Sequence, residues 1–129
     1  MSDYVISNWH KFTKTKNINI LNNILHKDII FYSPVLHNPK YGISVTKQYL
    51  KAAVEVLFQN NFKYISEIRG SNIASCEFEG YIEDIYINGL DLISWNKYNK
   101  ITSFKVFVRP LKGLVLLKDK MTEKLKQAN

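Results

Sequence analysis

The chain has 129 residues, of which 46% are hydrophobic, and it carries 18 basic against 11 acidic side chains. This length is typical of one domain with a buried core, and the hydrophobic fraction excludes a disordered chain. We therefore expect a single domain over residues 1–129. The one cysteine, Cys76, excludes an internal disulfide, so packing alone must stabilise the fold.

The net charge of +7 does not by itself predict a nucleic-acid-binding protein. Only Arg69 and Arg109 are arginines, and the lysines are spread along the whole chain. A nucleic-acid site clusters its basic residues and uses arginine to bind phosphate with two hydrogen bonds. We expect no nucleic-acid partner. The sequence also shows neither a secretory signal nor an apolar stretch long enough for a bilayer, which predicts a cytoplasmic protein without a membrane partner.

The first half of the chain predicts three helices and one strand. A first helix carries Val5, Trp9 and Phe12 on one face, and Ser2 or Asp3 is its expected N-cap. This apolar face must pack on another element, because an amphipathic helix buries one side.

A second, short helix begins after Asn17 as its N-cap, and a strand over residues 28–33 follows it and ends at Pro34. Ser44 is the expected N-cap of a longer helix over residues 45–58. The apolar positions of this longer helix repeat every three or four residues: Val45, Tyr49, Ala52, Ala53, Val56 and Leu57.

The second half alternates with the period of two that is typical of strands. In residues 62–69 the even-numbered side chains, Tyr64 among them, are expected on one face, with Glu67 and Arg69 on the other. Cys76 belongs to the next strand and is interpreted as a small buried residue without special reactivity.

A long strand over residues 85–95 and another that ends at Pro110 complete the alternating pattern, and an amphipathic helix follows. Helices that precede a meander of antiparallel strands predict an α+β fold, in which a curved sheet wraps around the helices as a cone. Such a cone leaves an internal pocket between the sheet and the helices. The side of the long strand that faces this pocket would carry Ile85, Ile87, Gly89, Asp91, Ile93 and Trp95.

Two stretches, ILNNILHKDIIFYSPVLHNPKYG and NGLDLISWNKYNKITSFKVFVRPL, resemble the nuclear transport factor 2-like (NTF2-like) superfamily. The resemblance rests on Asp28 opening a strand, Ser33 before Pro34, Gly42 before the third helix and Asp91 in a late strand, and it covers nearly the whole chain. It implies a cone-shaped NTF2-like fold, with N-terminal helices packed on a curved, mixed and mainly antiparallel sheet around an internal pocket. The similarity points to the SnoaL-like polyketide cyclases and the ketosteroid isomerases, in a bacterial branch.

Three functional positions of the ketosteroid isomerases fall on Ser33, Trp9 and Asp91. At the position of Ser33 the isomerases have the aspartate that moves the proton, and a serine is no general base unaided. Trp9 stands in place of an oxyanion tyrosine and can donate through its indole N–H, but it is not an acid. Asp91 matches a carboxylic acid that is held protonated. Because two of the three positions differ, steroid-type isomerisation is disfavoured.

Asp91 is the expected catalytic residue. Its neighbours on the inner face are apolar, so a charged carboxylate there would be costly, and a raised pKa would let it donate a hydrogen bond to a ligand oxygen. If the protein is an enzyme, Asp91 would be its acid–base group, with Ser33 and Trp9 as orienting donors. The structural alternative is a carboxylate satisfied by Trp9, Tyr49 or Arg109.

Four residues are expected to bind a ligand: Trp9, Ser33, Tyr49 and Trp95. Aromatic side chains with one polar atom suit a small apolar or ring-containing organic molecule, although such residues more often belong to the core. For Ser33 the alternative is a serine at the end of a strand whose hydroxyl bonds to nearby backbone.

No metal or other cofactor is expected. The three histidines, His10, His26 and His37, fall on a helix, a helix end and a loop, and form no metal-ligand spacing with carboxylates. A nucleophilic role for Ser33 is disfavoured as well, because none of these histidines is expected to face it.

Two functions stay open from the sequence. One is an isomerase, cyclase or hydratase that acts on a small oxygenated organic molecule with one positioned acid. The other is a non-catalytic ligand-binding or assembly module. The outer face of the sheet carries an apolar set that suits a homodimer: Tyr86, Leu90, Leu92 and Phe107. The two hypotheses are compatible, because dimerisation would use the outer face and ligand binding the inner one.

Overall fold

The computed structural model describes residues 3–59 and 61–127. The elements follow one another as α1 (Tyr4–Thr15), α2 (Ile18–Ile24), β1 (Leu25–Tyr32), β2 (Lys40–Tyr41), α3 (Ile43–Leu57), β3 (Lys63–Arg69), β4 (Ile73–Ile82), β5 (Ile85–Trp95), β6 (Ile101–Arg109) and α4 (Leu111–Gln127). Within the described ranges, no helix is both long and apolar enough to cross a membrane.

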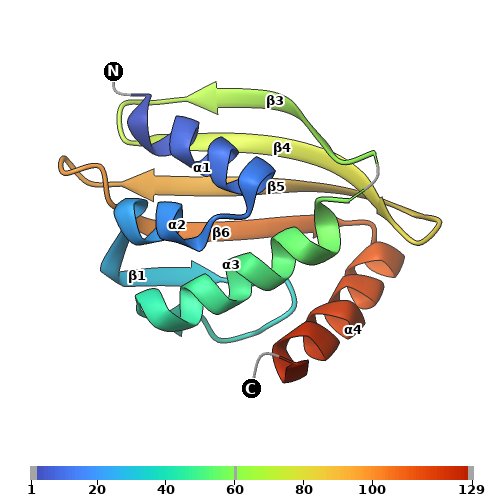
Figure 1. Cartoon of the computed structure of the whole chain (residues 1–129). Coiled ribbons are helices and arrows are strands. Elements are labelled where there is room, and N and C mark those ends of the chain that lie inside the picture. Colours follow the sequence, from blue (N-terminus) through green and yellow to red (C-terminus); the bar gives the residue numbers. More distant parts are fainter. Residues whose placement is uncertain (1–2, 60, 128–129) are drawn as a thin grey trace.

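The strands form a six-stranded mixed sheet in the order β2-β1-β6-β5-β4-β3. Strands β1 and β6 run parallel to each other, and every other neighbouring pair is antiparallel. Helices α1, α2 and α3 lie on one face of the curved sheet, and α4 packs beside α3 at one end of it (Figure 1). The predicted α+β cone is therefore confirmed.

The starts of the first two helices agree with the sequence in part. Asp3 occupies the N-cap position of α1, but its side chain makes no capping hydrogen bond, and Ser2 lies outside the described residues. Asn17 is the N-cap of α2, and its side-chain oxygen accepts a hydrogen bond from the backbone N–H of Asn19 at 3.0 Å. Asn17 therefore acts as predicted.

The predicted start of α3 is wrong. The helix begins at Ile43 and not after Ser44, and its N-cap is Gly42 with a φ of +102°. Glycine has no Cβ and reaches this backbone conformation without strain, so it can turn the chain directly into the helix. The buried face of α3 is also rotated from the predicted one and carries Thr46, Leu50, Ala52, Val54, Val56 and Leu57.

The core lies between the helices and the concave face of the sheet, in two clusters. One lies under α1 and α2 and contains the fully buried rings of Trp9, Phe12, Phe31 and Phe104. The other lies under α3 and α4, where Leu117 of α4 packs with residues of β4 and β5. Each large apolar side chain buried in this way contributes about 1.5–3 kcal/mol, so these clusters fix the helices on the sheet.

A β-bulge in β3 changes the face on which its later residues lie. Tyr64 pairs with Phe78 of β4, but the next paired residue is Ser66, so Ile65 is the extra residue. After the bulge Glu67 pairs with Cys76, whose side chain is fully buried on the inner face. The predicted alternation is therefore wrong beyond Tyr64. Glu67 shares the inner face with Tyr64, because a single inserted residue inverts the period of two.

Candidate functional site

A row of residues crosses the concave face of the sheet on four neighbouring strands. Glu67 of β3 pairs with Cys76 of β4, Cys76 pairs with Asp91 of β5, and Asp91 pairs with Val106 of β6. Asp91 is 5% exposed and so lies in the interior. The carboxyl group of Asp91, in the middle of β5, therefore lies at the centre of the concave face, between its paired neighbours on β4 and β6.

Tyr64 connects Asp91 to the first helix. The Tyr64 hydroxyl donates a hydrogen bond to Oδ2 of Asp91 at 2.6 Å, and the indole Nε1–H of Trp9 donates to the Tyr64 oxygen at 2.9 Å. The hydrogen-bond partner of Asp91 is therefore Tyr64, which the sequence reasoning did not single out. The available signal was the inward position of Tyr64 on a strand two places from β5.

Burial governs the acidity of this group. It raises the pKa of Asp91 from its ordinary value of 3.8 to about 7, while the hydrogen bond from Tyr64 works in the opposite direction. Burial also raises the pKa of Tyr64 well above 10, with the neighbouring Asp91 carboxylate as the next cause. A neutral hydroxyl compensates a buried carboxylate less than a cation would. Asp91 is therefore a carboxylic acid at mildly acidic pH and titrates near neutrality.

A hollow of about 720 Å³ opens where the end of α1, the end of α3 and the start of β3 meet. Its described lining residues are His10, Thr13, Lys14, Lys16, Phe58, Gln59, Phe62, Lys63 and Tyr64. This set does not include Trp9, Ser33 or Asp91. Tyr64 is thus the residue that both lines the hollow and contacts Asp91. Trp9 and Asp91 do not line the hollow, but each forms a hydrogen bond with the Tyr64 hydroxyl group.

The lining of the hollow combines aromatic rings with basic side chains. The rings of Phe58 and Phe62 stack with their centroids 3.6 Å apart. The rings of Phe62 and Tyr64 meet edge to face, with their centroids 5.4 Å apart. Lys14 and Lys63 are exposed residues of the same lining. Such a lining can accept an apolar ring against the phenylalanines and an anionic group beside the lysines.

The structure places the other three expected ligand-binding residues outside this hydrogen-bonded chain. The Ser33 oxygen accepts a hydrogen bond from the backbone N–H of Val35 at 3.3 Å, as in the structural alternative for this serine. The half-buried ring of Tyr49 lies 5.7 Å from that of Phe31. Trp95 is buried at the end of β5. Whether these residues meet a ligand stays a prediction.

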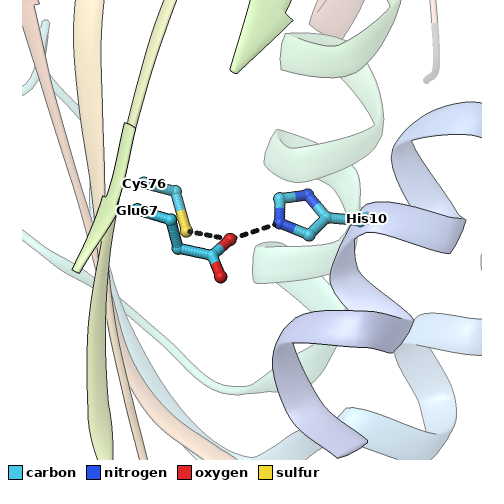
Figure 2. A group of neighbouring side chains, drawn as sticks. All are labelled: His10, Glu67 and Cys76. Atoms are coloured by element: carbon cyan, nitrogen blue, oxygen red, sulfur yellow. Dashed lines mark hydrogen bonds and ion pairs between the residues drawn. The ribbon is translucent and has the colours of Figure 1, made fainter. Parts of the chain in front are cut away.

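A second polar cluster lies beside the first and joins α1 to β3 and β4 (Figure 2). His10 Nε2 lies 2.7 Å from Oε1 of Glu67, and the Cys76 thiol approaches the same oxygen at 3.8 Å. Arg69 donates from Nε to Oε2 of Glu67 at 2.6 Å and also forms an ion pair with Asp3. The expectation that the histidines form no metal-ligand spacing with carboxylates is wrong for His10, because the bulge turns Glu67 inward beneath α1.

The ionisable groups of this cluster shift in different directions. Burial works to raise the pKa of Glu67, but the hydrogen bonds from His10 and Arg69 outweigh it and hold this pKa below its usual value. Burial raises the pKa of the Cys76 thiol to about 12, and the nearby Asp91 and Glu67 carboxylates add to the rise. In the protein as described, Glu67 is therefore a carboxylate and Cys76 a neutral thiol.

No protein-family model matches the chain, and no curated protein does either. Solved structures match it closely. A steroid delta-isomerase of Pseudomonas aeruginosa has a TM-score of 0.90 and 25% identity, over 99% of this chain and 96% of its own. A protein with a cystatin-like fold from Silicibacter pomeroyi has a TM-score of 0.86 and 22% identity, over 93% of this chain and 84% of its own.

More distant matches carry the superfamily's names. A SnoaL-like polyketide cyclase of Shewanella denitrificans matches with a TM-score of 0.65 and 12% identity, over 89% of this chain and 94% of its own. NTF2-like proteins match as well, among them one from Cytophaga hutchinsonii with a TM-score of 0.59 and 20% identity, over 85% of this chain and 90% of its own. The chain has an NTF2-like fold. The cone-shaped fold that the resemblance in the sequence implied is confirmed.

Proposed function

We propose that this NTF2-like chain binds a small oxygenated organic molecule beside Tyr64 and assists its isomerisation, cyclisation or hydration with the proton of Asp91. The observation that carries the proposal is the position of Tyr64, which lines the hollow and hydrogen-bonds to a buried carboxyl group. The similarity to a steroid delta-isomerase and to a SnoaL-like polyketide cyclase supports the first two reaction classes.

The protonation state of Asp91 would decide what Tyr64 offers a ligand. When Asp91 is ionised, the Tyr64 O–H donates to it, as the 2.6 Å contact describes. When Asp91 is protonated, its own O–H can donate to the Tyr64 oxygen, which releases the Tyr64 O–H to donate to a ligand oxygen. The N–H of Trp9 holds the Tyr64 oxygen in place in both states.

This arrangement can stabilise negative charge that develops on a ligand oxygen. As the charge grows, the Tyr64 proton moves towards the ligand oxygen and the Asp91 proton follows to Tyr64, so that the charge ends on the Asp91 carboxylate. Under this proposal Tyr64 touches the substrate, and Asp91 acts through it. This refines the sequence-based prediction, in which Asp91 met the ligand directly.

The lining of the hollow supports a narrower ligand class, namely a ring that carries an acidic group. The stacked Phe58 and Phe62 suit a flat apolar ring, and Lys14, Lys16 and Lys63 attract a carboxylate. A suitable probe is 6-hydroxy-2-naphthoate, which has a fused ring, a carboxylate and one hydroxyl group and is fluorescent.

The proposal is tested by titrating this probe against the wild type and against Tyr64→Phe, with Tyr98→Phe as the control. Tyr98 is 69% exposed in the turn between β5 and β6, so its hydroxyl should not matter. At pH 6, where Asp91 is mostly protonated, we expect Tyr64→Phe to weaken binding roughly two- to tenfold, since a lost hydrogen bond between neutral groups costs about 0.5–1.5 kcal/mol. Equal affinity of the wild type and Tyr64→Phe would contradict the proposal.

A second proposed function is self-association through the outer face of the sheet. Phe107 is 52% exposed and Tyr86 39% exposed on this face, and Leu90 pairs with Phe107 across β5 and β6. Exposed apolar side chains on a sheet face favour a symmetric dimer. Sedimentation at micromolar concentration should show a dimer for the wild type and a monomer for Phe107→Lys, with Tyr98→Lys as the control. A monomeric wild type would rule this out.

A further inference from the structure

Three side chains with different metal-ligating atoms converge from three elements of the fold. His10 comes from α1, Glu67 from β3 after the bulge, and Cys76 from β4. Figure 2 shows the three side chains pointing towards one another. Their imidazole, carboxylate and thiol ligand atoms all lie within 4.8 Å of one another.

We propose that His10, Glu67 and Cys76 form a site for a divalent transition-metal ion, with Zn²⁺ as the best-suited ion. A tetrahedral zinc ion with ordinary bond lengths needs its ligand atoms about 3.4–3.6 Å apart. The Cys76 sulfur lies 3.8 Å from Oε1 of Glu67, close to this spacing. His10 Nε2 lies 2.7 Å from the same oxygen and within 4.8 Å of the sulfur, so the imidazole must swing around Oε1 to bring both separations to this spacing.

The mixture of ligand atoms selects the class of ion. Thiolate and imidazole ligands favour zinc and other late transition metals, whereas Mg²⁺ and Ca²⁺ prefer oxygen ligands alone. Three protein ligands also leave one tetrahedral position for water, which distinguishes catalytic zinc sites from closed structural ones.

The surroundings of the site are compatible with a bound cation. Arg69 holds Oε2 of Glu67 and so leaves Oε1 as the metal-facing oxygen, in the manner of an outer residue that orients a ligand. Metal binding must displace the thiol proton of Cys76, because the thiolate is the ligand. Zn²⁺ and the loss of that proton together add one positive charge. The Asp91 carboxylate, beside Cys76 in the sheet register, offsets this charge when it is ionised.

An ion could reach the site from solvent. The side chains of His10 and Glu67 are 26% and 29% exposed, and His10 lines the hollow. Cys76 is fully buried beneath them. The site is thus a short recess that opens to solvent at His10 and Glu67 and ends at the buried sulfur of Cys76.

The decisive experiment adds Co²⁺ to the reduced, EDTA-washed chain and records its absorption spectrum. Because Cys76 is the one cysteine of the sequence, any thiolate-to-cobalt charge-transfer band must come from this residue. We expect such a band at one equivalent of Co²⁺, its loss on addition of Zn²⁺, and release of about one proton per ion. Absence of the charge-transfer band in the wild type would overturn the proposal.

Variants separate this site from adventitious binding at surface histidines. Cys76→Ser and His10→Ala should each weaken Zn²⁺ binding at least tenfold in competition with a chromophoric chelator, whereas His37→Ala, in an exposed loop, should not. Circular dichroism establishes that each variant is folded. Undiminished affinity in a folded Cys76→Ser variant would also overturn the proposal.

Discussion

Two carboxyl groups on the inner face of this sheet have opposite acidities. Asp91 and Glu67 are separated only by Cys76 in the register, yet the pKa of Asp91 rises to about 7 and that of Glu67 falls. Asp91 is 5% exposed and receives a neutral hydrogen bond from Tyr64, whereas Glu67 is partly exposed and contacts both His10 and Arg69.

The comparison shows that the hydrogen-bond partner of a carboxyl group, as much as its burial, decides whether the group is ionised. Asp91 loses the solvation of its charge and gains no cation in return, so its protonated form is favoured. Glu67 loses less solvation and gains hydrogen bonds from His10 and from the Arg69 guanidinium, so its ionised form is favoured. The inner face of one sheet thus carries a carboxyl group that is protonated at mildly acidic pH and another that is ionised at neutral pH, with Cys76 between them.

The largest expected effect comes from removing the charge of Asp91. Between pH 3.8 and about 7 the unfolded chain has lost this proton while the folded chain retains it, so stability falls as pH rises through this window. The loss is complete above pH 7 and is on the order of 4 kcal/mol. We expect Asp91→Asn, which cannot ionise, to become more stable than the wild type as pH rises.

Urea unfolding of both proteins from pH 4 to pH 8 measures this difference. Taking the difference between the two proteins cancels the titration of the other carboxyl groups, among them Glu67, which acts with the opposite sign. If the two stability curves stay parallel across this range, Asp91 is ionised in the folded protein and the contrast with Glu67 is lost.

A smaller effect is expected from crowding the ring beneath Tyr64. A Cβ at Gly89 would lie 2.7 Å from the carbonyl oxygen of Phe107 and still closer to the ring of Phe78, which packs edge-on against Tyr64. We expect Gly89→Ala to cost about 2–3 kcal/mol. Gly80→Ala is the matched control, because its Cβ would meet Phe62 at 3.3 Å and should cost less. Equal losses in thermal unfolding would contradict this explanation.

The inward position of Asp91 could be predicted from the sequence, whereas that of Glu67 could not. Asp91 follows from unbroken alternation along β5, whose inner side is buried at Ile87, Gly89, Ile93 and Trp95. The same rule fails on β3, because the alternation of apolar and polar residues breaks at Tyr64 and Ile65, where the bulge inserts an extra residue, whereas the prediction continues the strict period of two across this break.

The partners of each carboxyl group could not be predicted for a related reason. Tyr64 and His10 lie 27 and 57 residues away in sequence from the carboxyl groups they contact. These contacts depend on how α1 lies on the sheet and on the shifted register of β3. Neither is encoded in local periodicity, whereas the order of helices and strands is, and the fold could be predicted for that reason.

Removing the Tyr64 hydroxyl should cost about as much as crowding the Phe78 ring. Tyr64→Phe leaves the Trp9 N–H and the Asp91 carboxyl group without their described partner, and each unsatisfied buried polar group costs about 1–3 kcal/mol. The pKa of Asp91 should also rise further, because the Tyr64 hydrogen bond lowers it. Carboxyl-carbon NMR titration of Asp91 measures this shift, with Tyr98→Phe as the control. A pKa that falls or stays constant would show that Tyr64 does not stabilise the ionised form.

The smallest effect is expected at Glu67, where solvent already screens the charges. Glu67→Gln retains the shape of the side chain but loses the attraction to Arg69, which at a partly exposed site is worth less than about 1 kcal/mol. Because the pKa of Glu67 is lowered on folding, its contribution is present at neutral pH and disappears as pH falls below that of an ordinary glutamate. In the EDTA-washed protein we therefore expect Glu67→Gln to be slightly less stable than the wild type at pH 7, with a difference that shrinks as the pH falls through the lowered pKa of Glu67. Added salt should narrow the difference at pH 7, since it screens exposed pairs. A difference that does not shrink as the pH falls would mean that Glu67 stabilises the fold by packing and not by its charge, and the contrast with Asp91 would then concern position alone.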